Sequence, residues 1–134
     1  MASAFPAADT AVAGVDRLNL PPSSVQAEQA LLGGLMLDNP AWDRVADLVT
    51  AADFYRPDHR LIFTAIEVLA ERRQPFDAVT ISDYLESRAE LEDAGGLGYL
   101  GTLVRDTPSA ANVADYARII RDRALLRELV QTGN

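Results

Sequence analysis

The sequence predicts an all-α fold, a compact orthogonal bundle of about six helices that ends in a long C-terminal helix. Three observations indicate this class. Helix caps recur along the chain, apolar residues follow helical spacing, and short loops separate the segments. The one strand-like run, residues 76–81, carries cap residues that favour the start of a helix instead.

The first helix is predicted from about residue 23 to Leu37. Residues 1–20 are rich in Ala and small polar residues without a helical stripe, which predicts a disordered N-terminal tail. Ser23 and Gln26 then form a capping box. Gly33 and Gly34 inside this helix each lower its propensity by about 1 kcal/mol relative to Ala. We therefore expect another helix to approach closely there.

Four further helices complete a globular unit over residues 21–108. Asn39 as cap and Pro40 at the first position begin the second, and Thr50 with Asp53 caps a short turn. The third extends to about Arg73, whose charge would favour the helix dipole. The fourth begins at Thr80 with Asp83, a single turn covers residues 91–94, and the fifth covers residues 97–104 after a Gly95–Gly96 break. The expected inward residues of these helices are Trp42, Val45, Ala46, Val49, His59, Ile62, Phe63, Ile66, Leu69, Ala70, Ile81, Tyr84 and Leu85.

The long C-terminal helix, predicted over residues 109–131 with Ser109 as cap, has an apolar stripe that changes sides. One face carries Val113, Tyr116, Ala117, Ile120 and Ala124. The other side carries Leu125, Leu126, Leu129 and Val130, and Ile119 leans the same way. A helix that packs on one domain keeps a single stripe. We therefore expect the first half to pack on residues 21–108 and the second half to bind a partner.

Composition excludes several classes of function. The formal net charge is −8 and all 12 basic residues are Arg, which argues against direct DNA binding by this segment. The chain has no Cys, so disulfides and thiol nucleophiles are excluded. No run approaches the roughly 20 apolar residues of a membrane span, and no signal peptide is recognisable. We therefore expect a cytoplasmic protein without a membrane partner.

The search for chemistry gives no catalytic, cofactor or metal site. The single His, His59, falls on an apolar stripe, which predicts a buried side chain hydrogen-bonded to backbone. A small hydrolase that uses His59 with a carboxylate is the enzyme alternative. Residues 96–101 match G-x-G-x-x-G, but no strand precedes them, so a turn and a closely packed short helix explain these glycines. Without Lys there is no Walker A motif, and we expect this segment to lack nucleotide hydrolysis.

Five motifs in order resemble a known family. They are PPSSVQAEQALLGGLMLDN, DFYRPDHRLIFTAI, DAVTISDYL, GGLGYLGTLVRDTPSAANVADYARII and RALLREL. Together they cover about residues 20–134. This combination strongly resembles the N-terminal domain of the bacterial replicative hexameric DNA helicase, the DnaB family.

The resemblance implies a collar domain for assembly and docking. Six copies would associate as a trimer of dimers, and residues 109–134 would contain the first arm of an incomplete helical hairpin. ATP and Mg would belong to a linked RecA-like ATPase domain outside this chain. The collar would dock the C-terminal domain of primase and, in some systems, a helicase loader. Matching positions for primase contacts are Tyr99, Val130, Glu28 and Gln26, and those for self-association are Ile119, Leu125, Leu126, Leu129 and Val130.

Two readings compete with this one beside the hydrolase. The chain could be a stand-alone helical interaction module without a helicase context. It could also be a helical DNA-binding module, which the net charge of −8 opposes.

Overall fold

The computed structural model describes residues 21 and 23–132, and every regular element in these ranges is helical. The prediction of an all-α fold is therefore confirmed. The predicted tail, residues 1–20, lies outside the described residues. No helix in the described part is long and apolar enough to cross a membrane. The elements are α3 (Val25–Leu37), η1 (Asn39–Ala41), α4 (Trp42–Val45), η2 (Ala51–Asp53), α5 (Pro57–Glu71), α6 (Ala78–Ser87), α7 (Gly96–Arg105) and α8 (Val113–Thr132).

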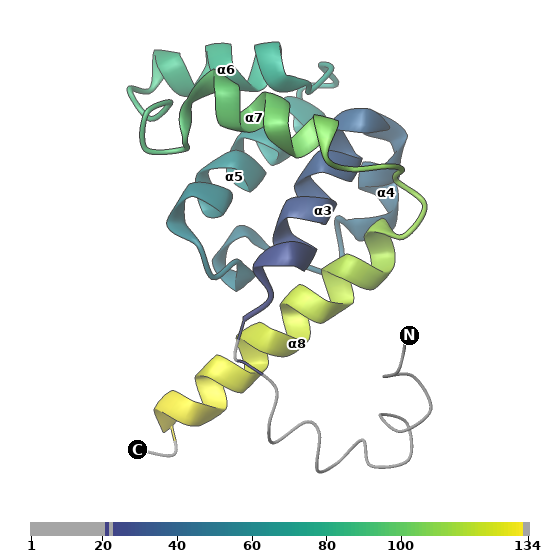
Figure 1. Ribbon diagram of the computed structural model, residues 1–134, viewed down its shortest axis with the longest axis vertical. Helices are drawn as coiled ribbons and strands as arrows, with labels where there is room; N and C mark the ends of the chain where they lie inside the picture. Colours follow the sequence, from purple (N-terminus) through teal and green to yellow (C-terminus); the bar gives the residue numbers. More distant parts are fainter. Residues whose placement is uncertain (1–20, 22, 133–134) are drawn as a thin grey trace.

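The helices form a bundle around α3, as Figure 1 shows. Helices α6 and α7 lie together across the top of the view, over α3 and α5. Helix α8 starts beside α3 and then runs away from the bundle toward the C-terminus. One end of the longest helix therefore belongs to the domain, and the other projects from it.

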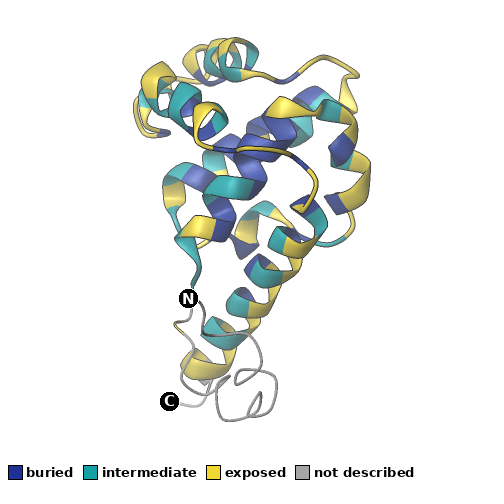
Figure 2. Ribbon diagram, turned by 45° about the vertical axis from the view of Figure 1, so that its right-hand side comes forward, coloured by how far each residue is buried: buried dark blue, intermediate teal, exposed yellow. Residues whose placement is uncertain are grey.

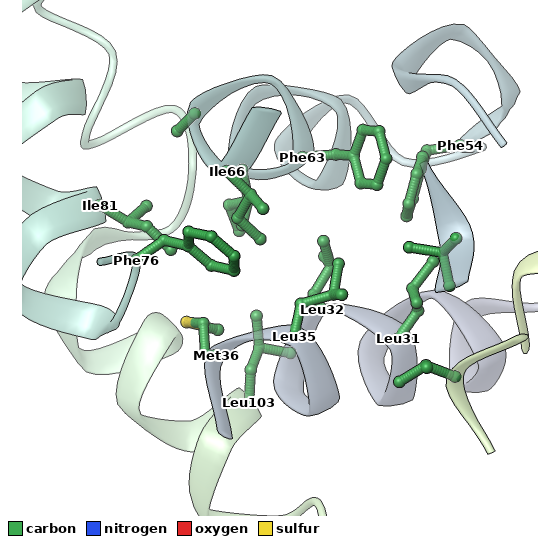
Figure 3. Close-up of a cluster of buried hydrophobic side chains, with 14 of the residues drawn as sticks. Leu31, Leu32, Leu35, Met36, Phe54, Phe63, Ile66, Phe76, Ile81 and Leu103 are labelled. Carbon is green, nitrogen blue, oxygen red and sulfur yellow. The ribbon is translucent and has the colours of Figure 1, made fainter. Parts of the chain in front are cut away.

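The core lies between α3, α5, α6 and α7 (Figure 3). Helix α3 is buried along most of its length, and its large buried apolar side chains are Leu31, Leu32, Leu35 and Met36. Phe63 and Ile66 from α5, Ile81 from α6 and Leu103 from α7 face them. The inward faces predicted for α5 and α6 are thus confirmed, since Phe63, Ile66 and Ile81 are fully buried.

The two glycines of α3 sit where other segments cross closely. A Cβ on Gly33 would lie 2.0 Å from Thr107 Oγ1 and 2.4 Å from the Leu103 carbonyl oxygen. A Cβ on Gly34 would lie 2.7 Å from Val113 Cγ1, at the start of α8. The predicted close approach is confirmed, and only glycine leaves room for it.

The glycines at the start of α7 differ from those within it. Gly95 and Gly96 adopt φ values of 102° and 82°, so the predicted break before this helix is confirmed. The expected close packing is wrong for Gly98 and Gly101, because a Cβ on either would meet no atom within 4 Å. These two positions instead leave an open strip on α7.

Four predicted helix starts are wrong by one to a few residues. The second segment begins as the 3₁₀ turn η1, whose N-cap is Asp38, so Asn39 is its first residue rather than its cap and Pro40 its second. Helix α3 is capped by Ser24 rather than Ser23, because the Ser24 hydroxyl accepts a hydrogen bond from the Ala27 N–H at 3.2 Å. Helix α6 is capped by Asp77, and Thr80 is the third helical residue that completes the box. Helix α8 begins at Val113, since Ser109 accepts from the Ala111 N–H and the intervening residues form a turn.

Two predicted ends also differ. Helix α5 stops at Glu71, and Arg73 adopts a left-handed φ of 57°, so Arg73 does not lie in the last helical turn. Helix α4 is a single turn, and Ala46 is exposed just after it rather than inward. The capped turn between Thr50 and Asp53 is confirmed, with both hydrogen bonds of the capping box present.

Candidate protein-docking surfaces

The last turns of α8 carry exposed apolar side chains. Val113, Ala117, Ile120 and Ala124 are all buried, so the first half packs on the domain as expected. The exposed fractions then rise to 40% for Leu125, 68% for Leu129 and 59% for Val130. Figure 2 shows the same change from buried to exposed residues along this helix. We call Leu125, Leu129 and Val130 the apolar tip.

The other two predicted self-association residues lie differently. Leu126 is half-buried, and Ile119 is partly buried against the hydrophobic core. The structure therefore keeps Ile119 within the domain and leaves the apolar tip outside it.

Arginine side chains connect the middle of α8 to the domain through hydrogen bonds and an ion pair. Arg121 Nη1 lies 2.7 Å from Asp53 Oδ1, and the Asp53 side chain is only 6% exposed. Arg127 donates to the Asp53 carbonyl oxygen at 2.7 Å, and its guanidinium lies 5.6 Å from the centre of the Tyr55 ring. Arg123 donates to the Ser23 carbonyl oxygen at 3.3 Å. The change of side in the apolar stripe therefore coincides with a row of polar anchors.

A buried carboxylate organises the junction between α3 and the segment that leads into α5. The Glu28 side chain on α3 is 1% exposed. It accepts hydrogen bonds from the Tyr55 N–H at 2.6 Å, from the Arg56 N–H at 3.4 Å and from His59 Nδ1 at 2.7 Å. Two backbone N–H groups and one imidazole nitrogen therefore surround this buried carboxyl group. Glu28 therefore faces inward rather than toward a partner.

His59 continues this network to α7. Its side chain is fully buried, and its Nε2 lies 2.6 Å from the Tyr99 hydroxyl. The two rings lie within 7° of parallel, with centroids 5.9 Å apart. Gln29 Nε2 donates to the same hydroxyl at 3.2 Å. The prediction that His59 is buried is confirmed, but its partners are two side chains and not backbone.

Arg56 covers the outer side of this group. Its guanidinium lies 5.5 Å from the centre of the Tyr99 ring, which is a cation–π distance. A hydrogen bond to the Asp58 carboxylate raises the pKa of Arg56 above its ordinary value. Arg56 therefore remains a cation beside Tyr99 at any physiological pH.

The Glu28–His59–Tyr99 chain has the order carboxylate, imidazole, hydroxyl that some hydrolases use. Here both imidazole nitrogens are occupied and the ring is fully buried. The hydroxyl is already flanked by His59 and Gln29. What this arrangement can do is hold one proton and one aromatic ring in place.

A small pocket of about 190 Å³ lies between α3, α7 and the segment before α8. Amide, hydroxyl and carboxylate groups line one part of it, and apolar groups line the rest. The lining residues are Gln26, Gln29, Ala30, Thr102, Leu103, Asp106, Thr107, Pro108 and Tyr116. Gln29 connects this pocket to Tyr99, so Gln26 and Tyr99 border one surface, which we call the α3/α7 face.

The predicted primase contacts do not form one cluster within the chain. Gln26 and Tyr99 border the α3/α7 face, with Glu28 buried behind it. Val130 belongs to the apolar tip, and Figure 1 shows the end of α8 at the opposite end of the view from α7. Sequence reasoning missed His59, Asp53 and the α8 arginines as organising residues, since their partners are distant in the chain.

Comparison with known proteins identifies the family. Residues 20–122 match the model of the DnaB-like helicase N terminal domain. The chain belongs to this family. It is 47% identical over 118 residues to the "Replicative DNA helicase DnaB" of Haemophilus influenzae, which covers 88% of this chain and 25% of that protein. The protein of the same name from Geobacillus stearothermophilus is 42% identical over 114 residues, covering 85% and 25%.

A solved structure agrees with this membership. The crystal structure of the N-terminal domain of DnaB helicase from Mycobacterium tuberculosis matches with a TM-score of 0.81 and 43% identity. The match covers 85% of this chain and 83% of that one. The chain spans about a quarter of the length of the curated relatives it matches, so it corresponds to their N-terminal domain.

Proposed function

We propose that this chain is the collar domain of a bacterial replicative helicase and acts in the cytoplasm in ring assembly and primase docking. The family membership supports the helicase context. Nucleotide hydrolysis, with ATP and Mg, and strand separation belong in this proposal to the part of the longer relatives that this chain does not span. A helicase loader is a further partner of the collar.

The observation that carries the assembly role is the apolar tip. Leu129 and Val130 are 68% and 59% exposed on a helix whose first half is well buried. Burying apolar surface contributes roughly 25 cal/mol per Å². A second α8 from a neighbouring copy offers the same apolar residues and, in an antiparallel or crossed arrangement, would cover them. Self-association through the tip therefore accounts for side chains that the domain itself leaves in water.

The α3/α7 face supports the docking role. It combines the amide of Gln26 with the ring of Tyr99 beside a pocket that also contains the Asp106 carboxylate. The net charge of −8 favours a partner with basic groups. Because Val130 lies at the far end of α8, a compact partner that contacts both regions fits best across two neighbouring copies.

Titration with the C-terminal domain of primase tests docking. Tyr99→Ala removes the ring from the α3/α7 face, and Val130→Asp places a charge on the apolar tip. We expect each variant to lower affinity by about tenfold or more, as for central interface residues. Val79→Ala is the matched control, since Val79 is 68% exposed on α6. Unchanged affinity in both test variants would place the docking surface elsewhere.

A DNA-binding role has a separate test. The fragment is expected not to retain a labelled single-stranded oligonucleotide, because its negative charge repels the phosphate backbone. Retention that falls steeply with added salt would contradict this part of the proposal.

A further inference from the structure

We propose that His59 is a positioning residue for docking: it holds the Tyr99 ring and binds the Tyr99 hydroxyl proton on the inner side. The hydroxyl then offers a partner a hydrogen-bond acceptor, so the partner group at this point is a donor, such as an ammonium, guanidinium or amide. This inference rests on the docking role proposed above for Tyr99. It adds the chemical character of the contact and the residue that sets it.

The hydrogen bonds around Glu28 determine which group carries the hydrogen between His59 Nδ1 and Glu28. Both carboxyl oxygens of Glu28 accept backbone N–H groups, and His59 Nδ1 lies 2.7 Å from Glu28 Oε1. His59 Nδ1 therefore carries a hydrogen and donates it. The Tyr55 and Arg56 amides donate to the same carboxylate, which holds Glu28 in place for this contact.

The surroundings of the Tyr99 hydroxyl determine the direction of its hydrogen bond with His59 Nε2. Gln29 Nε2 donates to this oxygen at 3.2 Å, so the oxygen already accepts one hydrogen bond. With a neutral His59, Nε2 is an acceptor, and the hydroxyl donates its only hydrogen to it at 2.6 Å. Every proton in the network then has one partner. One lone pair of the hydroxyl then has no hydrogen-bond partner among the described residues, and Tyr99 is only partly buried.

Protonation of His59 would reverse this arrangement. Nε2 would then donate to the Tyr99 oxygen, and the hydroxyl would have to turn its own hydrogen toward another acceptor. The charged groups that face the imidazole are Glu28 from α3 and Asp58, whose Oδ1 lies 3.8 Å from Nε2, with Arg56 over the Tyr99 ring. One buried proton therefore selects whether Tyr99 presents an acceptor or a donor.

A spectrum of the free domain tests the hydrogen-bond assignment without any partner. His59 is the single histidine, so its ring nitrogens can be labelled with ¹⁵N and read without ambiguity. We expect Nδ1 to be the nitrogen that carries the hydrogen and Nε2 to be the acceptor nitrogen. Tyr99→Phe should shift the Nε2 signal, because the hydroxyl donor is lost. Tyr84→Phe, on α6, is the matched control and should leave it in place. A protonated Nε2 in the wild-type domain would overturn the inference.

The pH dependence of binding tests the functional part. Affinity for the primase C-terminal domain is measured across the pH range in which the His59 nitrogen signals titrate. We expect wild-type affinity to fall with His59 protonation by roughly three- to tenfold, the effect of one misdirected hydrogen bond. The His59-linked component should be absent in His59→Gln and in Tyr99→Phe, because either change breaks the relay. If His59→Gln does not fold, Tyr99→Phe alone still tests the relay.

A structural control separates positioning from stability. The Asn39 side chain accepts from the Phe76 N–H at 3.0 Å and donates to the Phe76 carbonyl oxygen at 2.9 Å, far from Tyr99 in the hydrogen-bond network. Asn39→Ala should lower stability but keep the wild-type pH profile. Identical profiles in wild type and Tyr99→Phe would overturn the inference while leaving the docking proposal intact, provided Tyr99→Ala still weakens binding. Absence of binding in the wild type would overturn both.

Discussion

The two halves of α8 are built from similar residues but meet different surroundings. The first half places Val113, Ala117 and Ile120 against the domain with at most 1% of their surface exposed. The second half ends in Leu129 and Val130, which are more than half exposed. Since both halves are apolar on one side, the difference lies in what each side faces. The first half stabilises the fold, and we assign the second to association.

Polar contacts mark the boundary between the two halves. Arg121 and Arg127 both donate to Asp53, and Arg123 donates to the Ser23 carbonyl oxygen. These bonds hold the helix axis in one direction as it leaves the domain. The apolar tip is therefore presented at a defined angle rather than on a frayed end, which a specific interface between copies requires.

The largest expected effect comes from emptying the buried half. Ile120→Ala should lower the free energy of unfolding by about 2–5 kcal/mol, because Ile120 is 1% exposed and a cavity would remain. Leu129→Ala is the matched change in the other half and should alter it by less than about 0.5 kcal/mol. Urea unfolding of both variants measures the difference. Equal losses would remove the distinction between the halves.

The contact between α3 and the buried half of α8 also leaves no room for an added methyl group. Gly34→Ala should lower the free energy of unfolding by about 1–3 kcal/mol, since its Cβ would lie 2.7 Å from Val113 Cγ1. Gly98→Ala on α7 is the control, and we expect it to change the free energy of unfolding in the opposite direction. It meets no atom within 4 Å and should raise stability by up to about 1 kcal/mol through helix propensity. Thermal unfolding of both variants measures whether each change lowers or raises stability. A Gly34→Ala variant more stable than wild type would contradict the close packing.

The boundary contact should have an intermediate effect. Arg121→Ala leaves the buried carboxylate of Asp53 without one partner and should lower the free energy of unfolding by about 1–2 kcal/mol. Arg118→Ala removes an ion pair with Asp115 whose two side chains are 60% and 71% exposed. That control should change stability by less than about 0.5 kcal/mol. Similar losses in both variants would show that Asp53 does not anchor α8.

The smallest expected effect on stability is at the apolar tip. Leu129→Asp should change the free energy of unfolding by less than about 0.5 kcal/mol, because Leu129 makes little contact with the domain. Chemical unfolding at a low protein concentration, where the chain is monomeric, measures the contribution of Leu129 to the stability of the single domain. A large loss there would show that Leu129 serves the fold and not association.

Local patterns in the sequence predict the helices but not the network between them. Helical spacing places Phe63, Ile66 and Ile120 inward, and Gly33 and Gly34 indicate a close crossing, because these signals act within one helix. Cap positions shift by a few residues where several hydroxyl or carboxyl groups compete, as with Ser23 and Ser24. Their choice depends on which backbone N–H each side chain reaches after packing.

The polar contacts that organise the candidate site are long-range. His59 lies 31 positions from Glu28 and 40 from Tyr99, and Arg121 lies 68 from Asp53. No periodicity relates residues at such separations, so composition and spacing could not bring them together. The family resemblance pointed to Tyr99 and Glu28, yet it gave no indication that His59 lies between them.

Light scattering across a concentration series tests the central claim, that the apolar tip is an assembly surface. For this chain we expect the mass to rise above the monomer value of 14.5 kDa as concentration increases. The Leu129→Asp variant should stay at the monomer mass over the same range, with an unchanged fold. A strict monomer at every concentration, both for this chain and for a version lengthened by the segment that follows the matched region in the DnaB relatives, would contradict the claim.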